Sequence, residues 1–174
     1  MKKCDLMVDV GRRRFLSGAG VAAAGAAVAM TPLSAEAQQA RAAARVDYPA
    51  NRLGTVAELK VNEPKDVAYP DKDAPGVLIK LGKRVPGGVG PDGDIVGFST
   101  LCPHKGYPLA FNKADKTLNC PGHYSRFDCE TGGQQIWGQA TQNLAQYFLR
   151  VEANGDIVAE GLDELLYGRL SNVL

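Results

Sequence analysis

The sequence predicts an all-β fold in which short antiparallel strands form one small domain. Glycine and proline account for 20 and 10 of the 174 residues, and both favour the tight turns that join such strands. Short apolar runs bounded by Gly, Pro, Asn or Asp recur along the chain, whereas no helical period persists. A chain of this length can bury a core without disulfides, so one domain is expected.

Six short apolar runs are expected to form strands because each ends at turn-forming residues. In chain order they are Ala57–Val61, Val77–Leu81, Ile95–Ser99, Thr117–Asn119, Tyr147–Val151 and Ile157–Ala159. Residues 86–94 form a turn-rich link between two strands, and Asn154-Gly155 predicts a two-residue hairpin turn.

Two other parts of the chain are not expected to consist mainly of strands. A loop-rich stretch from about residue 100 to 142 interrupts the strands and contains both histidines of the chain. For residues 162–174 two interpretations stay open, namely a short helix or docking tail, and a segment that packs on the domain itself.

The N-terminal residues have the pattern of a targeting segment. Residues 11–16, Gly-Arg-Arg-Arg-Phe-Leu, look like a twin-arginine signal and precede a weakly apolar run at 17–33. That run is too short and too rich in small residues for a comfortable membrane span of roughly 20 apolar residues. We expect cleavage of segment 1–37 after Ala37, which leaves residues 38–174 as a periplasmic domain. An uncleaved membrane anchor is the alternative.

The charge balance excludes one class of partner. Lys and Arg number 20 and Asp and Glu number 19, which gives a formal net charge of +1. Such a chain has no field that attracts nucleic acid or an anionic membrane, so nucleic-acid binding is not expected. Loss of the signal segment would also remove Cys4 and leave three of the four cysteines.

Two loops each offer one thiol and one imidazole. The first has Cys102 and His104 as C-x-H, the second has Cys120 and His123 as C-x-x-H, and fifteen residues separate His104 from Cys120. Chance explains this pattern poorly, because both histidines of the chain follow a cysteine closely. A structural zinc site is the main alternative, although a zinc finger usually takes a cysteine pair from one knuckle and a histidine pair from a helix.

Mixed pairs suit a 2Fe-2S cluster better than a zinc ion. With one Cys and one His in each loop, both sulfurs can converge on one iron and both imidazoles on the other. Because imidazole is neutral where thiolate is anionic, the cluster is less negative and its potential rises to roughly −150 to +300 mV. The sequence therefore predicts a cluster that transfers single electrons.

Both loops resemble those of the Rieske family. Cys-Pro-His-Lys-Gly at 102–106 and Cys-Pro-Gly-His-Tyr-Ser-Arg-Phe-Asp at 120–128 are similar to the family patterns C-T-H-L-G-C and C-P-C-H-G-S-x-Y-D. Residues 138–144, Gly-Gln-Ala-Thr-Gln-Asn-Leu, look like the family's third loop. The resemblance implies a Rieske-type antiparallel β domain with an inserted cluster-binding loop subdomain.

Within the family, four segments look like the small subunit of arsenite oxidase. They are residues 48–53, 102–106, 138–144 and 167–174. This resemblance implies a large periplasmic partner subunit with a molybdopterin centre, where arsenite becomes arsenate. The chain would pass electrons from that subunit to a soluble cytochrome c or a cupredoxin. The Rieske subunit of a cytochrome bc complex, a Rieske ferredoxin or oxygenase component, and a zinc-stabilised binding module are the alternatives.

The chain departs from the family pattern beside the cluster ligands. The two disulfide cysteines of the family map onto Tyr107 and Gly122, so the bridge that usually clamps the loops is absent. Ser125 keeps the hydroxyl that the resemblance implies as a donor to a bridging sulfide. The family's Tyr, however, maps onto Phe127, which has no hydroxyl. Fewer donors predict a potential in the lower to middle part of the family range.

Two further residues have open interpretations. Lys105 replaces a leucine that usually shields the cluster, and it is interpreted either as a cation that orients an acidic partner or as a solvated side chain. Cys129 is left over among the three remaining cysteines and has no partner for a disulfide. A packed free thiol is expected there rather than a reactive one.

Overall fold

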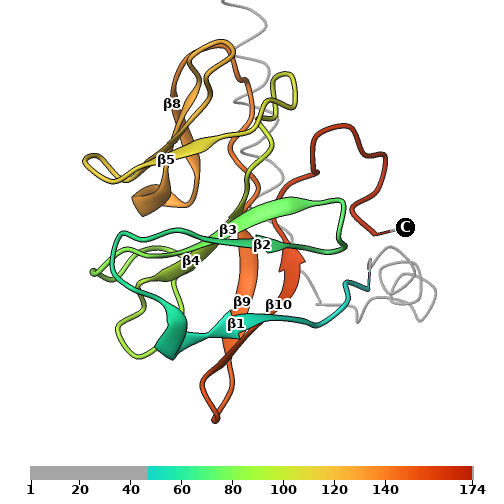
Figure 1. The fold of residues 1–174 in the computed structure, drawn as a ribbon. Helices are drawn as coiled ribbons and strands as arrows, with labels where there is room; N and C mark the ends of the chain where they lie inside the picture. The colour runs from blue at the N-terminus through green and yellow to red at the C-terminus, as the bar shows by residue number, and fades with distance from the viewer. Residues whose placement is uncertain (1–46, 174) are drawn as a thin grey trace, which may run out of the picture. The chain divides into compact units, whose positions relative to one another are not determined.

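The computed structural model describes residues 47–173, which form ten short strands and two 3-10 turns (Figure 1). Their bounds are β1 Asn51–Thr55, η1 Val56–Glu58, β2 Lys65–Ala68, β3 Pro75–Lys80, β4 Ile95–Ser99, β5 Ala110–Asn112, β6 Thr117–Asn119, β7 Arg126–Asp128, η2 Cys129–Thr131, β8 Gln134–Trp137, β9 Tyr147–Val151 and β10 Asp156–Leu162. The expected signal segment and Cys4 lie outside these residues. No helix within 47–173 is long and apolar enough to cross a membrane.

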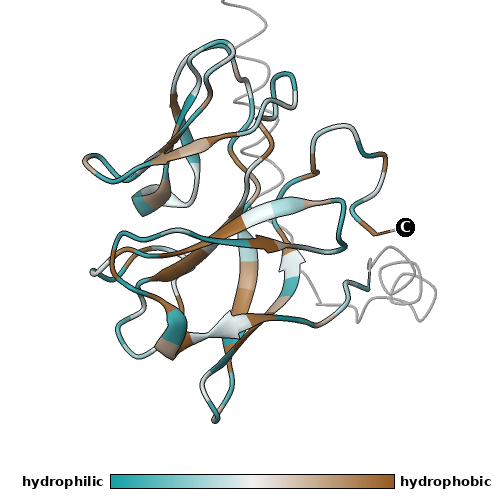
Figure 2. Ribbon diagram, viewed as in Figure 1, coloured by the Kyte–Doolittle hydropathy of each residue, from teal (hydrophilic) through white to brown (hydrophobic). Residues whose placement is uncertain are grey.

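Two three-stranded antiparallel sheets form the base of the domain. One sheet has the order β1-β10-β9 and the other has the order β2-β3-β4. They connect where Ser99, at the end of β4, donates its backbone N–H to the carbonyl of Ala145 at 3.0 Å. Both sheets contribute to the core, since Leu78, Ile95 and Ile157 share one buried cluster. In Figure 2 β4 is brown along most of its length, whereas the tip of the β9–β10 hairpin is teal.

Strands β5 to β8 form a third antiparallel sheet in the order β5-β6-β7-β8. This sheet lies above the base sheets in the view of Figure 1. The first cysteine-histidine loop lies in the connection from β4 to β5, and the second connects β6 to β7. The expected inserted subdomain is therefore confirmed, but it is more regular than the loop-rich stretch that the sequence predicted. Strands β5, β7 and β8 have three or four residues and largely exposed or half-exposed, polar patterns such as Arg-Phe-Asp in β7, which hide them from a search for apolar runs.

A buried cluster and a set of ion pairs hold this subdomain to the base. The cluster contains side chains from both parts, among them Val77, Ile79, Phe98, Leu118 and Phe127. At its edge the carboxylate of Glu130 accepts from the ammonium groups of Lys83 at 2.7 Å and Lys116 at 2.9 Å. Lys116 also donates to the carbonyl of Leu81 at 3.0 Å.

Most of the predicted strands are confirmed. Strands β4, β6 and β9 have the predicted bounds, β3 begins two residues earlier and ends one residue earlier, and Ile157–Ala159 lies within the longer β10. The prediction of a strand at Ala57–Val61 is wrong, because β1 ends at Thr55 and one 3-10 turn follows. The carboxylate of Glu58 accepts the backbone N–H of Thr55, which favours a turn over an extended chain there.

The β9–β10 hairpin turns over three residues rather than the predicted two. Glu152 donates its N–H to the carbonyl of Asp156 at 2.9 Å, and Gly155 donates its N–H back to the carbonyl of Glu152 at 2.9 Å. Gly155 has a φ of 86°, the left-handed conformation that such a three-residue loop requires and that glycine adopts without steric cost.

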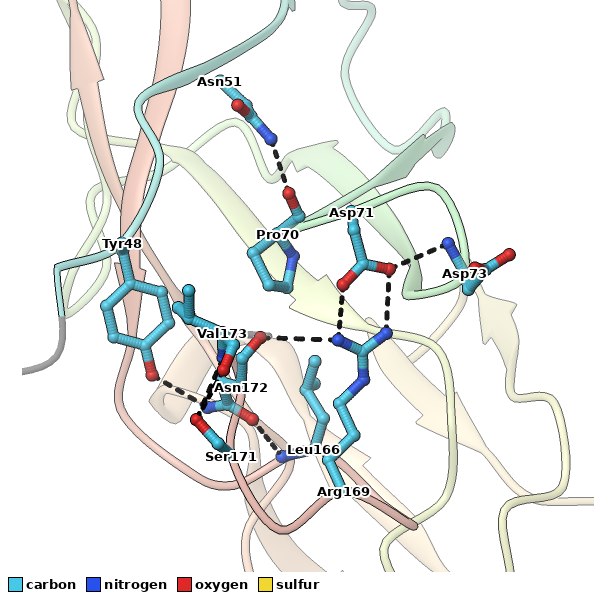
Figure 3. Close-up of polar contacts among 10 residues, drawn as sticks. All are labelled: Tyr48, Asn51, Pro70, Asp71, Asp73, Leu166, Arg169, Ser171, Asn172 and Val173. Atoms are coloured by element: carbon cyan, nitrogen blue, oxygen red, sulfur yellow. Dashed lines mark hydrogen bonds and ion pairs between the residues drawn. The ribbon is translucent and has the colours of Figure 1, made fainter.

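The segment after β10 forms no helix among residues 163–173 and packs back on the domain, which confirms the second interpretation of this tail. Leu166 is buried and belongs to the same core cluster as Tyr69 and Tyr147. Arg169 forms an ion pair with Asp71 in the connection between β2 and β3 (Figure 3).

Candidate metal centre

The two cysteine-histidine loops share one backbone hydrogen-bond pattern. Cys102 donates its N–H to the carbonyl of Tyr107 at 2.9 Å, and its own carbonyl accepts from the N–H of Gly106 at 2.8 Å. Cys120 repeats both bonds, since it donates to the carbonyl of Ser125 at 2.8 Å and accepts from the N–H four positions later at 3.1 Å. Each cysteine thus begins a turn of the same size, and the two turns form a matched pair.

Each turn needs a left-handed residue at the same place. That residue is Gly106 in the first loop, with a φ of 68°, and Tyr124 in the second, with a φ of 59°. Glycine adopts this conformation freely, whereas a tyrosine is strained there by about 1 kcal/mol or more. Such strain persists only where the surrounding structure enforces it, which is a feature of functional loops.

The two thiols lie together at the buried side of the loops. Cys102 and Cys120 are 0% and 3% exposed and belong to one core cluster. Burial raises the pKa of the Cys102 thiol, and the neighbouring Cys120 raises it further. Backbone N–H groups of His104 and Lys105 point toward the Cys102 sulfur and act in the opposite direction on this pKa. The site therefore already offers the donors that a bound thiolate requires.

The two imidazoles lie together at the outer side. The ring centroids of His104 and His123 are 4.8 Å apart, with an angle of 77° between the ring planes. His123 is exposed, whereas the Nδ1 atom of His104 is buried and has no hydrogen-bond partner. A buried imidazole nitrogen without a partner is costly in a folded protein, and metal ligation is a common reason for one.

The two thiols lie together and the two imidazoles lie together, and this arrangement fits a site with two irons. Among residues 47–173, no three His, Cys, Asp or Glu side chains converge on the position of a single metal ion. Structural zinc binds four protein ligands around one ion, whereas each iron of a mixed cysteine-histidine 2Fe-2S cluster takes only two. A thiol pair beside an imidazole pair is the donor set of such a cluster.

Ser125 connects the second loop to the third. Its side chain is fully buried, and its Oγ accepts the backbone N–H groups of Gln139 at 3.1 Å and Ala140 at 3.0 Å. Gly138 allows this approach, because a Cβ atom there would lie within 3 Å of the Ser125 backbone. Two accepted hydrogen bonds occupy the lone pairs of the hydroxyl oxygen and leave its proton to donate elsewhere.

The remaining residues singled out in the sequence occupy distinct environments. Tyr107 lies with its ring against Gly122 and edge-on to His123, at a centroid distance of 5.8 Å. Phe127 is fully buried in the core, and Lys105 is exposed. Cys129 is 1% exposed, which confirms a packed thiol, and burial raises the pKa of this thiol to about 12.

Sequence reasoning missed an exposed aromatic pair beside the loops. Tyr124 and Trp137 are 73% and 67% exposed, and both line a groove of about 660 Å³ together with Cys120 and Arg126. A second hollow beside it is lined by His123 and the same two aromatic residues. The available signal was that Trp137 is the single tryptophan of the chain and that Tyr124 directly follows a candidate ligand.

Comparison with known proteins agrees with this geometry. The family model of the Rieske [2Fe-2S] domain matches residues 50–148. The chain is 40% identical to the iodate reductase subunit IdrB of Denitromonas iodatirespirans, over 92% of this chain and 85% of that protein. It is also 40% identical to the iodate reductase subunit IdrB of Pseudomonas sp. (strain SCT), over 90% of this chain and 81% of that protein.

A solved structure supports the fold. The soluble domain of the Rieske protein II from Sulfolobus acidocaldarius matches with a TM-score of 0.64 and 22% identity, over 70% of this chain and 82% of that chain. Sequence identity at this level supports the architecture alone. The family model and the two relatives also support membership of the family. The chain therefore belongs to the Rieske family, whose domain binds a 2Fe-2S cluster.

Proposed function

We propose that this chain is the electron-transfer subunit of a periplasmic arsenite oxidase. The observation that carries the proposal is the pairing of buried Cys102 with Cys120 and of His104 with the exposed His123. One end of the site is thus shielded from water, and the other end is open to a partner protein. Such a site suits the passage of single electrons between proteins rather than the conversion of a bound substrate.

We assign Cys102 and Cys120 as thiolate ligands of one iron and His104 and His123 as imidazole ligands of the other. The unpartnered Nδ1 atom supports His104 as a ligand through that nitrogen. When bound, the cluster supplies one-electron redox chemistry. The protein contributes burial of the thiolates, backbone donors near the Cys102 sulfur and an exposed imidazole edge.

Hydrogen bonds from this chain tune the potential of the site. The proton of the Ser125 hydroxyl is free to donate toward the loops, because the oxygen already accepts two backbone N–H groups. Phe127 offers no second hydroxyl. Since each donor stabilises the more negative reduced state, one donor fewer favours a potential in the lower to middle part of roughly −150 to +300 mV.

Four segments of the chain resemble the small subunit of arsenite oxidase, and this resemblance supports the proposal. They are residues 48–53, 102–106, 138–144 and 167–174. All four meet the site or one another in the structure. Asn172 in the last segment donates to the hydroxyl of Tyr48 in the first at 2.9 Å, and Tyr167 in the last segment contacts Gly106 in the first loop. Residues 139 and 140 of the third segment donate to Ser125 in the second loop. In this proposal a large molybdopterin subunit oxidises arsenite, and the chain carries electrons out to a soluble cytochrome c or a cupredoxin.

Iodate reductase is the second candidate. The 40% identity with two iodate reductase subunits over at least 90% of this chain favours it. The cluster site would serve both enzymes, but the electrons would move in opposite directions. An arsenite oxidase delivers electrons to the carrier protein, whereas an iodate reductase draws electrons from it.

Direction of electron flow therefore separates the two candidates. The complex would be purified from the periplasm through a tag on this chain and analysed for molybdenum and iron. We expect molybdenum to co-purify, and arsenite to drive reduction of oxidised cytochrome c. Oxidation of reduced cytochrome c by iodate, with no response to arsenite, would assign the second candidate. Reduction by a quinol alone would assign a cytochrome bc role and contradict both.

Export is a separate part of the proposal. The twin-arginine pattern at 11–16 supports transport of the folded domain into the periplasm, with cleavage after Ala37. Replacement of Arg12 and Arg13 by lysine should retain the protein in the cytoplasm, as cell fractionation would measure. Normal export of that variant would contradict this route.

A further inference from the structure

The segment after β10 forms a strap across the domain, defined here as residues 163–173 (Figure 3). Its first anchor is Arg169, whose guanidinium makes two hydrogen bonds to the carboxylate of Asp71, one of them at 2.8 Å from Nη2. The Arg169 side chain is only 15% exposed, and its charge lowers the pKa of Asp71. This two-bond geometry fixes the orientation of the guanidinium as well as its position.

Asn172 is the second anchor. It is 6% exposed and makes three hydrogen bonds: its amide donates to the hydroxyl of Tyr48 at 2.9 Å and to the carbonyl of Glu164 at 2.8 Å, and its oxygen accepts the N–H of Leu166 at 2.8 Å. The strap is therefore closed on itself and tied to the start of the domain. Figure 3 shows Asn172 between Tyr48 and Leu166.

Tyr167 lies between Leu166, whose N–H donates to Asn172, and the anchor Arg169, and it reaches the first loop of the metal centre. A Cβ atom on Gly106 would lie 2.6 Å from Cδ1 of the Tyr167 ring, so the ring rests directly on the glycine backbone. Gly106 is the left-handed residue of that loop, and its N–H donates to the carbonyl of Cys102 at 2.8 Å. Movement of the ring would therefore disturb the turn that presents Cys102.

We infer that Tyr167 is a positioning residue for the first cluster loop, which the anchored strap presses against Gly106 so that the turn at Cys102 keeps its shape. This inference rests on the assignment of Cys102 and His104 as ligands. The same turn directs the N–H groups of His104 and Lys105 to the Cys102 sulfur. Loss of the ring should weaken those donors and leave the reduced cluster less stabilised.

A strap that only stabilises the fold is the competing explanation, and the chain offers a matched control for it. Phe148 in β9 lies over Gly161 in β10, where a Cβ atom would be 2.9 Å from its ring. This is the same kind of contact, and Phe148 is also partly exposed, at 58% against 41% for Tyr167. It lies in the base sheet, away from both cluster loops.

The experiment compares Tyr167→Ala, Tyr167→Phe and Phe148→Ala in the full cluster-loaded protein. Tyr167→Ala should speed hydrogen exchange at residues 102–107 about tenfold, the change that ~1.4 kcal/mol of lost local stability produces. It should also shift the midpoint potential downward. Tyr167→Phe keeps the ring and should behave as wild type in both measurements, while Phe148→Ala should lower the unfolding temperature without either change.

A second variant removes an anchor and leaves the ring in place. Arg169→Gln should reproduce the faster exchange at residues 102–107 and the lower potential, and it keeps the test decisive if Tyr167→Ala fails to fold. The inference requires both changes, so faster exchange with an unchanged potential, or the reverse, overturns it. Equal effects from Phe148→Ala overturn it as well. Iron retained in Cys102→Ser would instead contradict the ligand assignment, whatever Tyr167 does.

Discussion

The ring of Tyr107 rests on the backbone of Gly122, so the two cluster loops touch at the positions where the Rieske family has a disulfide. A Cβ atom on Gly122 would lie 2.9 Å from two carbons of that ring. The contact has no covalent bond and no hydrogen bond, yet it joins the loop of Cys102 to the loop of Cys120. Packing thus replaces the bridge in this protein.

The first prediction concerns that contact. Tyr107→Cys combined with Gly122→Cys should form a disulfide in the oxidising periplasm, provided that the two Cα atoms lie within the usual range of about 4.4–6.8 Å. A bridge would hold the backbone donors more firmly and raise the midpoint potential modestly. Stability should change by less than the about 3 kcal/mol of a free loop closure, because the metal bonds already restrain both loops.

Mass spectrometry would verify the bridge, and redox titration would measure the shift. Each single cysteine variant is a necessary control, because loss of the Tyr107 ring also removes packing. A formed bridge with a potential at or below that of the wild type would refute the idea that the missing disulfide lowers the potential.

The second prediction tests the exposed aromatic pair. Trp137→Ala should slow electron transfer between the cluster and its partner protein, because the indole lies beside His123 at the open end of the site. The midpoint potential should stay unchanged, since the indole makes no hydrogen bond to the loops among the described residues. Stopped-flow kinetics at several partner concentrations would measure the effect. An unchanged rate, or a slower rate fully explained by a shifted potential, would contradict it.

The third prediction concerns the ion pairs that hold the cluster subdomain to the base. Glu130→Gln should lower the free energy of unfolding by about 0.5–1 kcal/mol near pH 7, because the carboxylate pairs with partly exposed Lys83 and Lys116. These two lysines lower the pKa of Glu130, so its stabilisation is present above 4.5, the ordinary value, and disappears as pH falls through the lowered value. Urea unfolding should show a smaller difference at pH 3.5 than at pH 7. Equal differences at both pH values would contradict the ion-pair explanation.

The fourth prediction concerns alkaline stability. Burial raises the pKa of Cys129 to about 12 from an ordinary 9.0, so the folded protein holds the neutral thiol while the unfolded chain ionises. Stability should therefore fall as pH rises from 9 toward 12, by roughly 1–3 kcal/mol for this residue. Cys129→Ala should remove that part of the loss and leave the contribution of Tyr69, whose pKa burial also raises to about 12. An identical pH dependence in the variant would contradict the assignment to Cys129.

The residues of the candidate metal centre could be predicted from the sequence alone because few residue types can do this chemistry. Both histidines of the chain and two of its cysteines fall in two short loops, so spacing was enough to select Cys102, His104, Cys120 and His123. The separation into a thiol pair and an imidazole pair needed the fold, since it depends on how the two turns face each other.

Other features depend on contacts between segments that are distant in sequence. The contact of the Tyr167 ring with Gly106 and the hydrogen bond from Asn172 to Tyr48 leave no signal in the local sequence pattern. Strands β3, β4, β9 and β10 were predictable from their apolar residues, and β4 is buried along its whole length. Strands β1 and β2 in the base and β7 and β8 above it were not predicted, because they carry polar residues whose extended form is fixed by pairing with neighbours.

The central claim is that two cysteines and two histidines of this chain hold the cluster, and iron content of single variants tests it most directly. Wild type and Cys129→Ser should each bind about two irons per chain and give the same electron paramagnetic resonance spectrum after reduction. Substitution of Cys102, His104, Cys120 or His123 by Ser or Ala should abolish that spectrum with loss of iron. Loss of the cluster in Cys129→Ser, or an intact wild-type spectrum in any of the four ligand variants, would contradict the account.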